Sequence, residues 1–198
     1  MPTAWSRHRF VLLVAVLALA AGLGGGIPGA SSAPLDGGPP ATDKVARGQW
    51  LVEVLGCNVC HTPRLPDGRP DMNFLMAGHR AKDPYPAWND SLFSKGYGML
   101  VSTSGTAFAG PWGVTFARNL TPDKTTGIGG WTEDAFINVL REGMLKPPMP
   151  ALAYGLLSDD DLKAMFTYLA TLKPVSNLVP FRQLTPPRLP GEIPGQKP

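Results

Sequence analysis

Cysteine occurs at two positions in this chain, Cys57 and Cys60, and both lie in the pentapeptide Cys57-Asn58-Val59-Cys60-His61. The C-x-x-C-H spacing is typical of covalent haem attachment. Two thiols can add to the two vinyl groups of a porphyrin while the adjacent imidazole ligates the iron. The motif therefore predicts one haem c, held by Cys57 and Cys60 with His61 as the proximal axial ligand, and favours electron carriage.

Three other sites could use parts of this pentapeptide. A structural zinc site needs two more nitrogen or sulfur ligands, yet His79 is the only other histidine or cysteine downstream of the signal-like N-terminus. A thioredoxin-type pair follows a β-strand, whereas Cys57 follows a helical pattern and Gly56. A plain disulfide leaves His61 without a role. Haem attachment is the interpretation that uses all three residues.

A second axial ligand must come from a methionine or from the remaining downstream histidine. The candidates are Met72, Met76, Met99, Met144, Met149, Met165 and His79. Met149 lies in Lys146-Pro147-Pro148-Met149-Pro150, where three prolines stiffen the backbone and can hold a thioether in place. Met165 fits the apolar face of a helix and is expected in the core. Met149 is the predicted ligand, and Met144 and His79 are the main alternatives.

The residues before the motif predict a helix that delivers Cys57 to the haem. Thr42 is the expected N-cap, and an apolar pattern with helical spacing runs to Gly56. The members of this pattern are Val45, Gly48, Val52 and Leu55. A glycine inside a helix costs about 1 kcal/mol relative to alanine, so we expect another helix to cross closely at Gly48, with Tyr168 as its partner.

Two further helices are expected near the C-terminus. Thr132 should cap a helix that ends at Arg141 or Glu142, with an apolar face formed by Ala135, Phe136, Val139 and Leu140. Ser158 should cap a helix that starts with three aspartates and continues to Pro174. Between His61 and Trp131 we expect loops folded over the haem, with short strands near 98–103 and 113–117.

The N-terminus predicts export. Arg7 and Arg9 flank a histidine, an apolar run follows from residue 10 to 21, and small residues at 29–33 suit a signal peptidase. The expected organisation is a signal peptide at 1–33, a flexible lead-in at 34–41, a haem domain at 42–178 and a proline-rich tail at 179–198. An uncleaved anchor is the alternative, and both outcomes place the domain in the periplasm.

The charge balance does not suggest nucleic acid as a partner. The formal net charge is +3, and removing Arg7 and Arg9 leaves 16 basic and 15 acidic side chains. Membrane association is expected only if the N-terminal segment remains uncleaved.

Several motifs together resemble one haem module of the cytochrome c subunits of periplasmic alcohol, aldehyde and gluconate dehydrogenases. They are Asn119-Leu120-Thr121-Pro122-Asp123, Thr126-Gly127-Ile128-Gly129-Gly130-Trp131, Met149-Pro150 and the pattern from Asp159 to Leu169. The resemblance covers roughly residues 42–178 and implies a mainly α, class I cytochrome c fold with three or more helices and long irregular loops. It also implies that Met149 is the sixth ligand.

The chain departs from this family in two ways. Such subunits usually contain two or three haem modules, whereas one C-x-x-C-H occurs here, so the chain resembles a stand-alone relative. The stretch 79–110 is also longer than a minimal module needs, and it could shield the haem, form a partner surface or be a family-specific loop.

The resemblance implies transfer of single electrons between a dehydrogenase and the respiratory chain or a terminal oxidase, without catalysis by this chain. Arg118, Asn119 and Trp131 are the expected propionate or pocket contacts, and a backbone carbonyl near Pro70 is the expected partner of His61. Two alternatives stay open: an open sixth site in a gas sensor or peroxidase-like enzyme, and a non-catalytic docking subunit of a dehydrogenase.

Overall fold

The computed structural model describes residues 37–86, 90–141 and 147–181. The expected signal peptide, residues 182–198 of the expected tail, and Met144 lie outside these ranges. The described residues belong to one compact unit, Ser32–Pro198. Its helices are α1 (Lys44–Val54), α2 (Cys57–His61), α3 (Asp90–Ser94), α4 (Glu133–Arg141), α5 (Ala151–Gly155), α6 (Asp159–Thr171) and a 3₁₀ turn (Met72–Phe74). Its strands are β1 (Leu100–Val101), β2 (Ala107–Gly110) and β3 (Gly113–Phe116).

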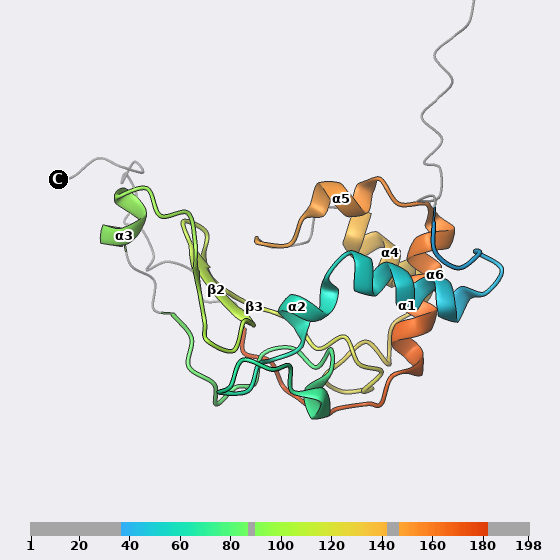
Figure 1. Ribbon diagram of the computed structural model, residues 1–198, viewed down its shortest axis with the longest axis horizontal. Helices are drawn as coiled ribbons and strands as arrows, with labels where there is room; N and C mark the ends of the chain where they lie inside the picture. Colours follow the sequence, from blue (N-terminus) through green and yellow to red (C-terminus); the bar gives the residue numbers. More distant parts are fainter. Residues whose placement is uncertain (1–36, 87–89, 142–146, 182–198) are drawn as a thin grey trace, which may run out of the picture. The chain divides into compact units, whose positions relative to one another are not determined.

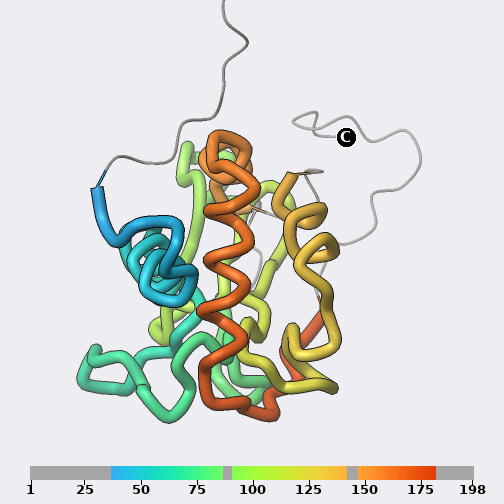
Figure 2. The backbone as a smooth tube through the Cα atoms, turned by 90° about the vertical axis from the view of Figure 1, so that its right-hand side faces the viewer, coloured from blue at the N-terminus to red at the C-terminus, as the bar shows by residue number. Residues whose placement is uncertain are grey.

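Helix predominates over strand, as the sequence predicts (Figure 1). Helix α6 runs between α1 on one side and α4 on the other (Figure 2). Within the three described ranges, no helix is long and apolar enough to cross a membrane.

The crossing of α1 and α6 occurs where the sequence predicts it, at Gly48. A Cβ atom on Gly48 would overlap the carbonyl oxygen of Ala164 and would lie 2.8 Å from the Cβ of Tyr168. The missing side chain therefore lets the two backbones touch, and the close packing compensates for the low helix propensity of glycine. Leu51, Leu162 and other apolar side chains of these helices continue this contact into the main core.

A buried ion pair also joins the two helices. The Nε of Arg47 donates to the Oδ1 of Asp161 over 2.8 Å, and both side chains are at most 4% exposed. Arg47 also donates to the carbonyl of Gly37 over 2.7 Å, so part of the expected lead-in lies against α1. A charge pair buried this deeply is costly to separate, because water cannot replace the lost partner at a buried charge.

The start of α1 differs from the prediction by one residue. The N-cap is Asp43, whose carboxylate accepts from the N–H of Ala46 over 3.0 Å, so the assignment of the cap to Thr42 was wrong. Val45 is largely exposed, and the buried face consists of Arg47, Gly48, Leu51 and Val52. An arginine on the inner face cannot be recognised from hydrophobic periodicity, since its burial depends on the distant Asp161.

The caps of α4 and α6 are as predicted. The Thr132 hydroxyl accepts from the N–H of Ala135 over 3.1 Å, and the Ser158 hydroxyl accepts from the N–H of Asp161 over 3.1 Å. The predicted inner face of α4 needs one correction, because Ala135 is exposed and Ile137 is buried.

The stretch beyond His79 contributes a small antiparallel sheet in the order β1-β2-β3. The sequence predicts β1 and β3 but not β2, which pairs with β3 from Ala107 opposite Phe116 to Gly110 opposite Gly113. Strands β2 and β3 are buried along their whole length. Val179 packs with them in a second apolar cluster.

Candidate functional site

The two cysteines and His61 lie on one short helix, α2. Gly56 precedes it with φ +68°, a left-handed conformation that glycine adopts without strain, and this turn separates α2 from α1. Cys57 and Cys60 are three residues apart and therefore lie on the same face of the helix. Both thiols are free, so the structure does not pair them as a disulfide.

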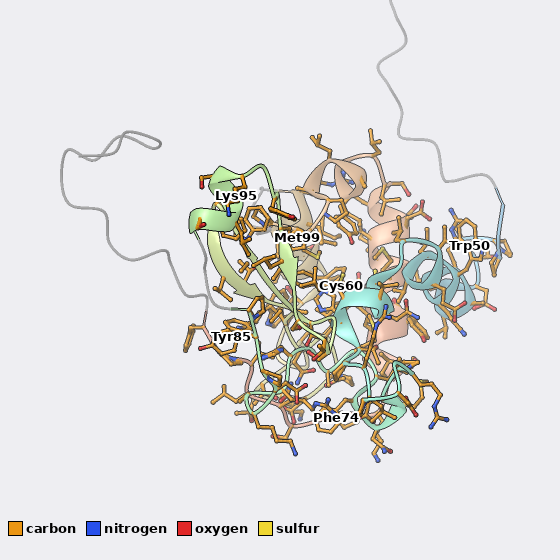
Figure 3. All side chains as sticks on the ribbon, turned by 60° about the vertical axis from the view of Figure 1, so that its left-hand side comes forward. Trp50, Cys60, Phe74, Tyr85, Lys95 and Met99 are labelled. Atoms are coloured by element: carbon orange, nitrogen blue, oxygen red, sulfur yellow. The ribbon has the colours of Figure 1, made fainter. Side chains whose placement is uncertain are left out.

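This face of α2 borders a cavity of about 500 Å³. Cys60 lies on α2 between the sheet side, marked by Met99, and the α1 side, marked by Trp50 (Figure 3). The lining includes Cys57, Cys60, His61, Phe108, Thr115, Phe116, Arg118, Leu120, Trp131, Phe136, Leu140, Met149, Tyr154, Met165, Leu169, Pro180 and Phe181. Most of these side chains are apolar, so the cavity suits a large apolar ligand with a few polar anchors.

The imidazole of His61 has a fixed orientation. Its Nδ1 lies 2.7 Å from the carbonyl oxygen of Arg118, which can only accept, so Nδ1 carries the hydrogen and Nε2 keeps its lone pair. The sequence placed this acceptor near Pro70, and the structure corrects it to Arg118, 57 residues away from His61 along the chain. Burial lowers the pKa of His61, while the bond to the carbonyl raises it. A neutral imidazole with a free Nε2 is the form that ligates a metal.

Neither cysteine has the low pKa of a redox-active thiol. Burial raises the pKa of Cys57 to about 11, and the hydrogen bond with Tyr154 only partly opposes this. Burial also raises the pKa of Cys60, and the positive charge of Arg64, which lowers this pKa, only partly opposes the effect. Thioredoxin-type chemistry needs a thiolate near neutral pH, so these environments argue against that alternative.

Two methionines of the described residues line the cavity, Met149 and Met165. Met165 is almost fully buried in the main core, as predicted, yet it also borders the cavity. Met149 packs against the edge of the core from the loop before α5. Met72 and Met99 are exposed, and Met76 is buried without bordering the cavity.

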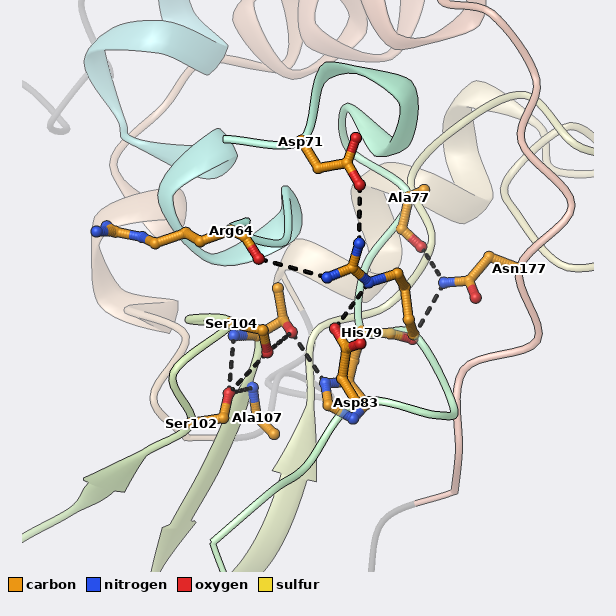
Figure 4. A network of polar contacts seen from close by, with 11 residues as sticks. Arg64, Asp71, Ala77, His79, Asp83, Ser102, Ser104, Ala107 and Asn177 are labelled. Carbon is orange, nitrogen blue, oxygen red and sulfur yellow. Dashed lines mark hydrogen bonds and ion pairs between the residues drawn. The ribbon is translucent and has the colours of Figure 1, made fainter. Parts of the chain in front are cut away.

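His79, the alternative axial ligand, is not among the residues that line the cavity. Its side chain is fully buried, and its Nδ1 lies 2.9 Å from the hydroxyl of Thr106 (Figure 4). Its ring packs on Phe116. Its Nε2 is buried and has no hydrogen-bond partner. Burial lowers the pKa of His79. The structure therefore places His79 beside the polar chain of Ser104 and Thr106 and not at the cavity.

The three expected propionate contacts separate into two groups. Arg118 and Trp131 line the cavity, and both are exposed at its rim. Asn119 does not line it, because its amide donates to the carbonyl of Val175 over 2.8 Å and to the hydroxyl of Thr126 over 3.0 Å. Asn119 is thus engaged in holding the C-terminal segment.

The longer stretch 79–110 reaches this site through Phe108 on β2, and β3 follows that stretch directly in the chain. Phe108 on β2 and Phe116 on β3 form part of the cavity wall. The hydroxyl of Thr115 donates to the carbonyl of Pro147 over 2.7 Å, which ties the sheet to the loop that carries Met149. The sheet therefore shields one side of the cavity.

Several lining residues were not predicted from the sequence, including Tyr154, Phe108, Pro180 and Phe181. The proline-rich stretch after α6 gave no sign that its start reaches the cavity. Aromatic residues in a sequence are equally compatible with the core, so their types alone could not have placed them here.

No model of a protein family matches the chain. It is similar to the fructose dehydrogenase cytochrome subunit of Gluconobacter japonicus, with 32% identity over 147 residues, 71% of this chain and 24% of that protein. It is 41% identical over 130 residues to the gluconate 2-dehydrogenase cytochrome c subunit of Pantoea cypripedii, covering 63% of this chain and 22% of that protein. The cytochrome c subunit of the quinone alcohol dehydrogenase of Gluconobacter oxydans is 37% identical over 139 residues, 67% of this chain and 22% of that protein.

The chain thus spans about a quarter of the length of these curated relatives. All three of these relatives are cytochrome subunits of dehydrogenases.

Proposed function

We propose that this chain, which carries a cytochrome c module similar to those of the fructose, gluconate and alcohol dehydrogenase cytochrome subunits, is a mono-haem c-type cytochrome that carries single electrons. The observation that carries this proposal is the convergence of Cys57, Cys60, His61 and Met149 on one apolar cavity. The first three come from α2, and Met149 comes from a loop that follows α4 in the chain.

The cavity fits a haem on three counts. Its volume of about 500 Å³ falls within the range of about 300–1,000 Å³ that cofactor sites have. Two free thiols lie on one face of α2 beside it. The Nε2 of His61 is the ring nitrogen available to a metal, because the Arg118 carbonyl holds Nδ1. Cys57 and Cys60 would form the thioethers, and His61 and Met149 would ligate the iron.

A bound haem c supplies a one-electron Fe(III)/Fe(II) couple. The residues of the chain tune and protect that couple. Phe108, Phe116 and Phe136 exclude water, and a methionine ligand in an apolar cavity favours the ferrous state. Arg118 and Trp131 lie at the rim, where they can contact the propionates.

The proposal extends to the fold, the compartment and the partners. Helices α4 and α6, which line the cavity, and α1, which packs against α6, support a class I cytochrome c fold to which the sheet has been added. Export by the N-terminal segment would place the domain in the periplasm. There we propose a dehydrogenase as electron donor and the respiratory chain as acceptor, supported by the names of the relatives.

Covalent attachment tests this proposal directly. The exported protein should retain haem on a denaturing gel, with a mass equal to the mature polypeptide plus one haem. Cys57→Ala and Cys60→Ala together should remove the haem stain, whereas His79→Gln should keep it. A wild-type protein without covalent haem, produced in a host that matures c-type cytochromes, would contradict the proposal.

A further inference from the structure

The segment Val175–Phe181, here called the C-terminal strap, is hydrogen-bonded to two stretches that contact His61, residues 77–79 and 118–121. The N–H of Val175 donates to the Thr121 hydroxyl over 3.1 Å, and its carbonyl accepts from Asn119. The guanidinium of Arg118 donates to the carbonyl of Pro180 over 3.1 Å. The strap is therefore fixed at both ends to the stretch that also supplies the hydrogen-bond acceptor of His61.

Asn177 makes the most buried contacts of the strap. Its amide nitrogen donates to the carbonyl of Ala77 over 2.7 Å and to the carbonyl of His79 over 3.0 Å (Figure 4). Both hydrogens of the amide are thereby used, and both acceptors are buried main-chain groups. One side chain thus clamps the carbonyls on either side of Gly78.

Gly78 lies directly against the Arg118 carbonyl. Its φ is +76°, and a Cβ at this position would lie 2.6 Å from the Arg118 carbonyl carbon and 2.7 Å from the carbonyl oxygen. The N–H of Gly78 donates to the carbonyl of His61 over 2.8 Å. The next residue, His79, donates its N–H to the carbonyl of Ala117 over 3.0 Å. Residues 77–79 therefore bond to the backbone of His61 and to the carbonyl of Ala117, and Gly78 packs against the next carbonyl, that of Arg118, which orients the ring.

We infer that Asn177 is a positioning residue for His61: by clamping 77–79 it keeps the Arg118 carbonyl in place as the acceptor of the imidazole Nδ1–H. This inference rests on the proposed haem ligation by His61. A partner that accepts the Nδ1 hydrogen fixes the ring orientation and makes the imidazole a more basic ligand. The C-terminal strap would thus contribute to the reduction potential without contacting the iron.

The test compares the holoprotein with Asn177→Ala. Without the clamp, 77–79 can move, the Nδ1–H bond weakens, and a less basic imidazole stabilises the ferric state less. We expect the variant to keep a low-spin spectrum and to have a higher midpoint potential than the wild type. In the reduced protein, NMR should show the His61 Nδ1 proton exchanging about tenfold faster, the factor that corresponds to loss of one hydrogen bond.

Ser158→Ala is the matched control, because it removes a helix cap far along the chain from His61 and should lower the melting temperature without moving the potential or the proton exchange. Gly78→Ala should act like Asn177→Ala, because its Cβ would displace the same carbonyl.

An unchanged potential and exchange rate in folded Asn177→Ala would overturn the inference. If neither variant folds, the wild-type protein decides: a slowly exchanging Nδ1 proton supports the inference, and fast exchange with solvent overturns it. A wild-type protein without covalent haem would instead be a failure of the proposed function.

Discussion

The backbone of Gly48 in α1 lies directly on the carbonyl group of Ala164 in α6, with no side chain between these two residues. This contact sets the distance between the helix that precedes the haem-attachment motif and the helix that carries Met165. Its position explains why a glycine occurs inside α1, where propensity alone disfavours it.

Gly48→Ala should therefore destabilise the protein strongly, by about 3 kcal/mol or more, because the added methyl group collides with backbone that cannot rotate away. Thermal unfolding of the holoprotein measures the effect. Gly155→Ala is the matched control, since a Cβ there meets nothing within 4 Å. It should be neutral or stabilising by up to about 1 kcal/mol. Equal melting temperatures for the two variants would contradict the crossing.

Removing one partner of the Arg47–Asp161 pair should cost more stability than replacing both partners with apolar residues. Asp161→Asn removes the carboxylate charge that faces the buried Arg47 guanidinium and should cost about 3–5 kcal/mol in urea unfolding. The double variant Arg47→Met with Asp161→Leu should recover part of this loss. Arg69→Ala removes the exposed pair with Asp67 and should cost less than about 1 kcal/mol. A double variant no more stable than Asp161→Asn would show that the pair does not act as a unit.

Asp123 should make stability depend on acid pH. The N–H and hydroxyl of Thr126 donate to its carboxylate over 2.7 and 2.8 Å, and these bonds lower the pKa of Asp123 below its ordinary value. A carboxyl with a depressed folded-state pKa stabilises the fold above the unfolded pKa and loses that contribution as pH falls through the folded pKa.

Asp123→Asn should accordingly melt a few degrees below the wild type at pH 7, and the difference should shrink below about pH 4, the ordinary range of an aspartate. Melting curves of both proteins at a series of pH values between neutral and strongly acidic check this. A difference that stayed constant over the whole series would show that the charge of Asp123 has no part in the effect.

The helical part of this fold follows from local sequence signals. The caps Thr132 and Ser158 and the glycine at the α1–α6 crossing could be predicted because capping and close packing each leave a residue type at a fixed spacing. Strand β2 could not, because Ala107–Gly110 is buried on both faces and shows no alternation of apolar and polar residues.

From the sequence, the cavity lining could be predicted only for the C-x-x-C-H motif, for Met149 and for the rim residues Arg118 and Trp131. The spacing of Cys57, Cys60 and His61 and the prolines around Met149 can be recognised because each signal lies within a few consecutive residues. The acceptor of His61 could not be found, because the Arg118 carbonyl reaches it through tertiary packing and any residue type can supply a carbonyl. The place of Met165 at the cavity could not be predicted either, because the buried face of α6 contributes to both the core and the cavity wall.

In the proposed function, Met149 completes the coordination of a haem held by Cys57, Cys60 and His61. It is tested most directly by optical spectra of the ferric and ferrous protein with and without carbon monoxide, for the wild type, Met149→Ala and the control Met165→Leu. The wild type and Met165→Leu should be low-spin, with a methionine-to-ferric charge-transfer band and no response to carbon monoxide, whereas ferrous Met149→Ala should bind the gas. A wild type that binds carbon monoxide, or a Met149→Ala protein that keeps the charge-transfer band, would contradict the account.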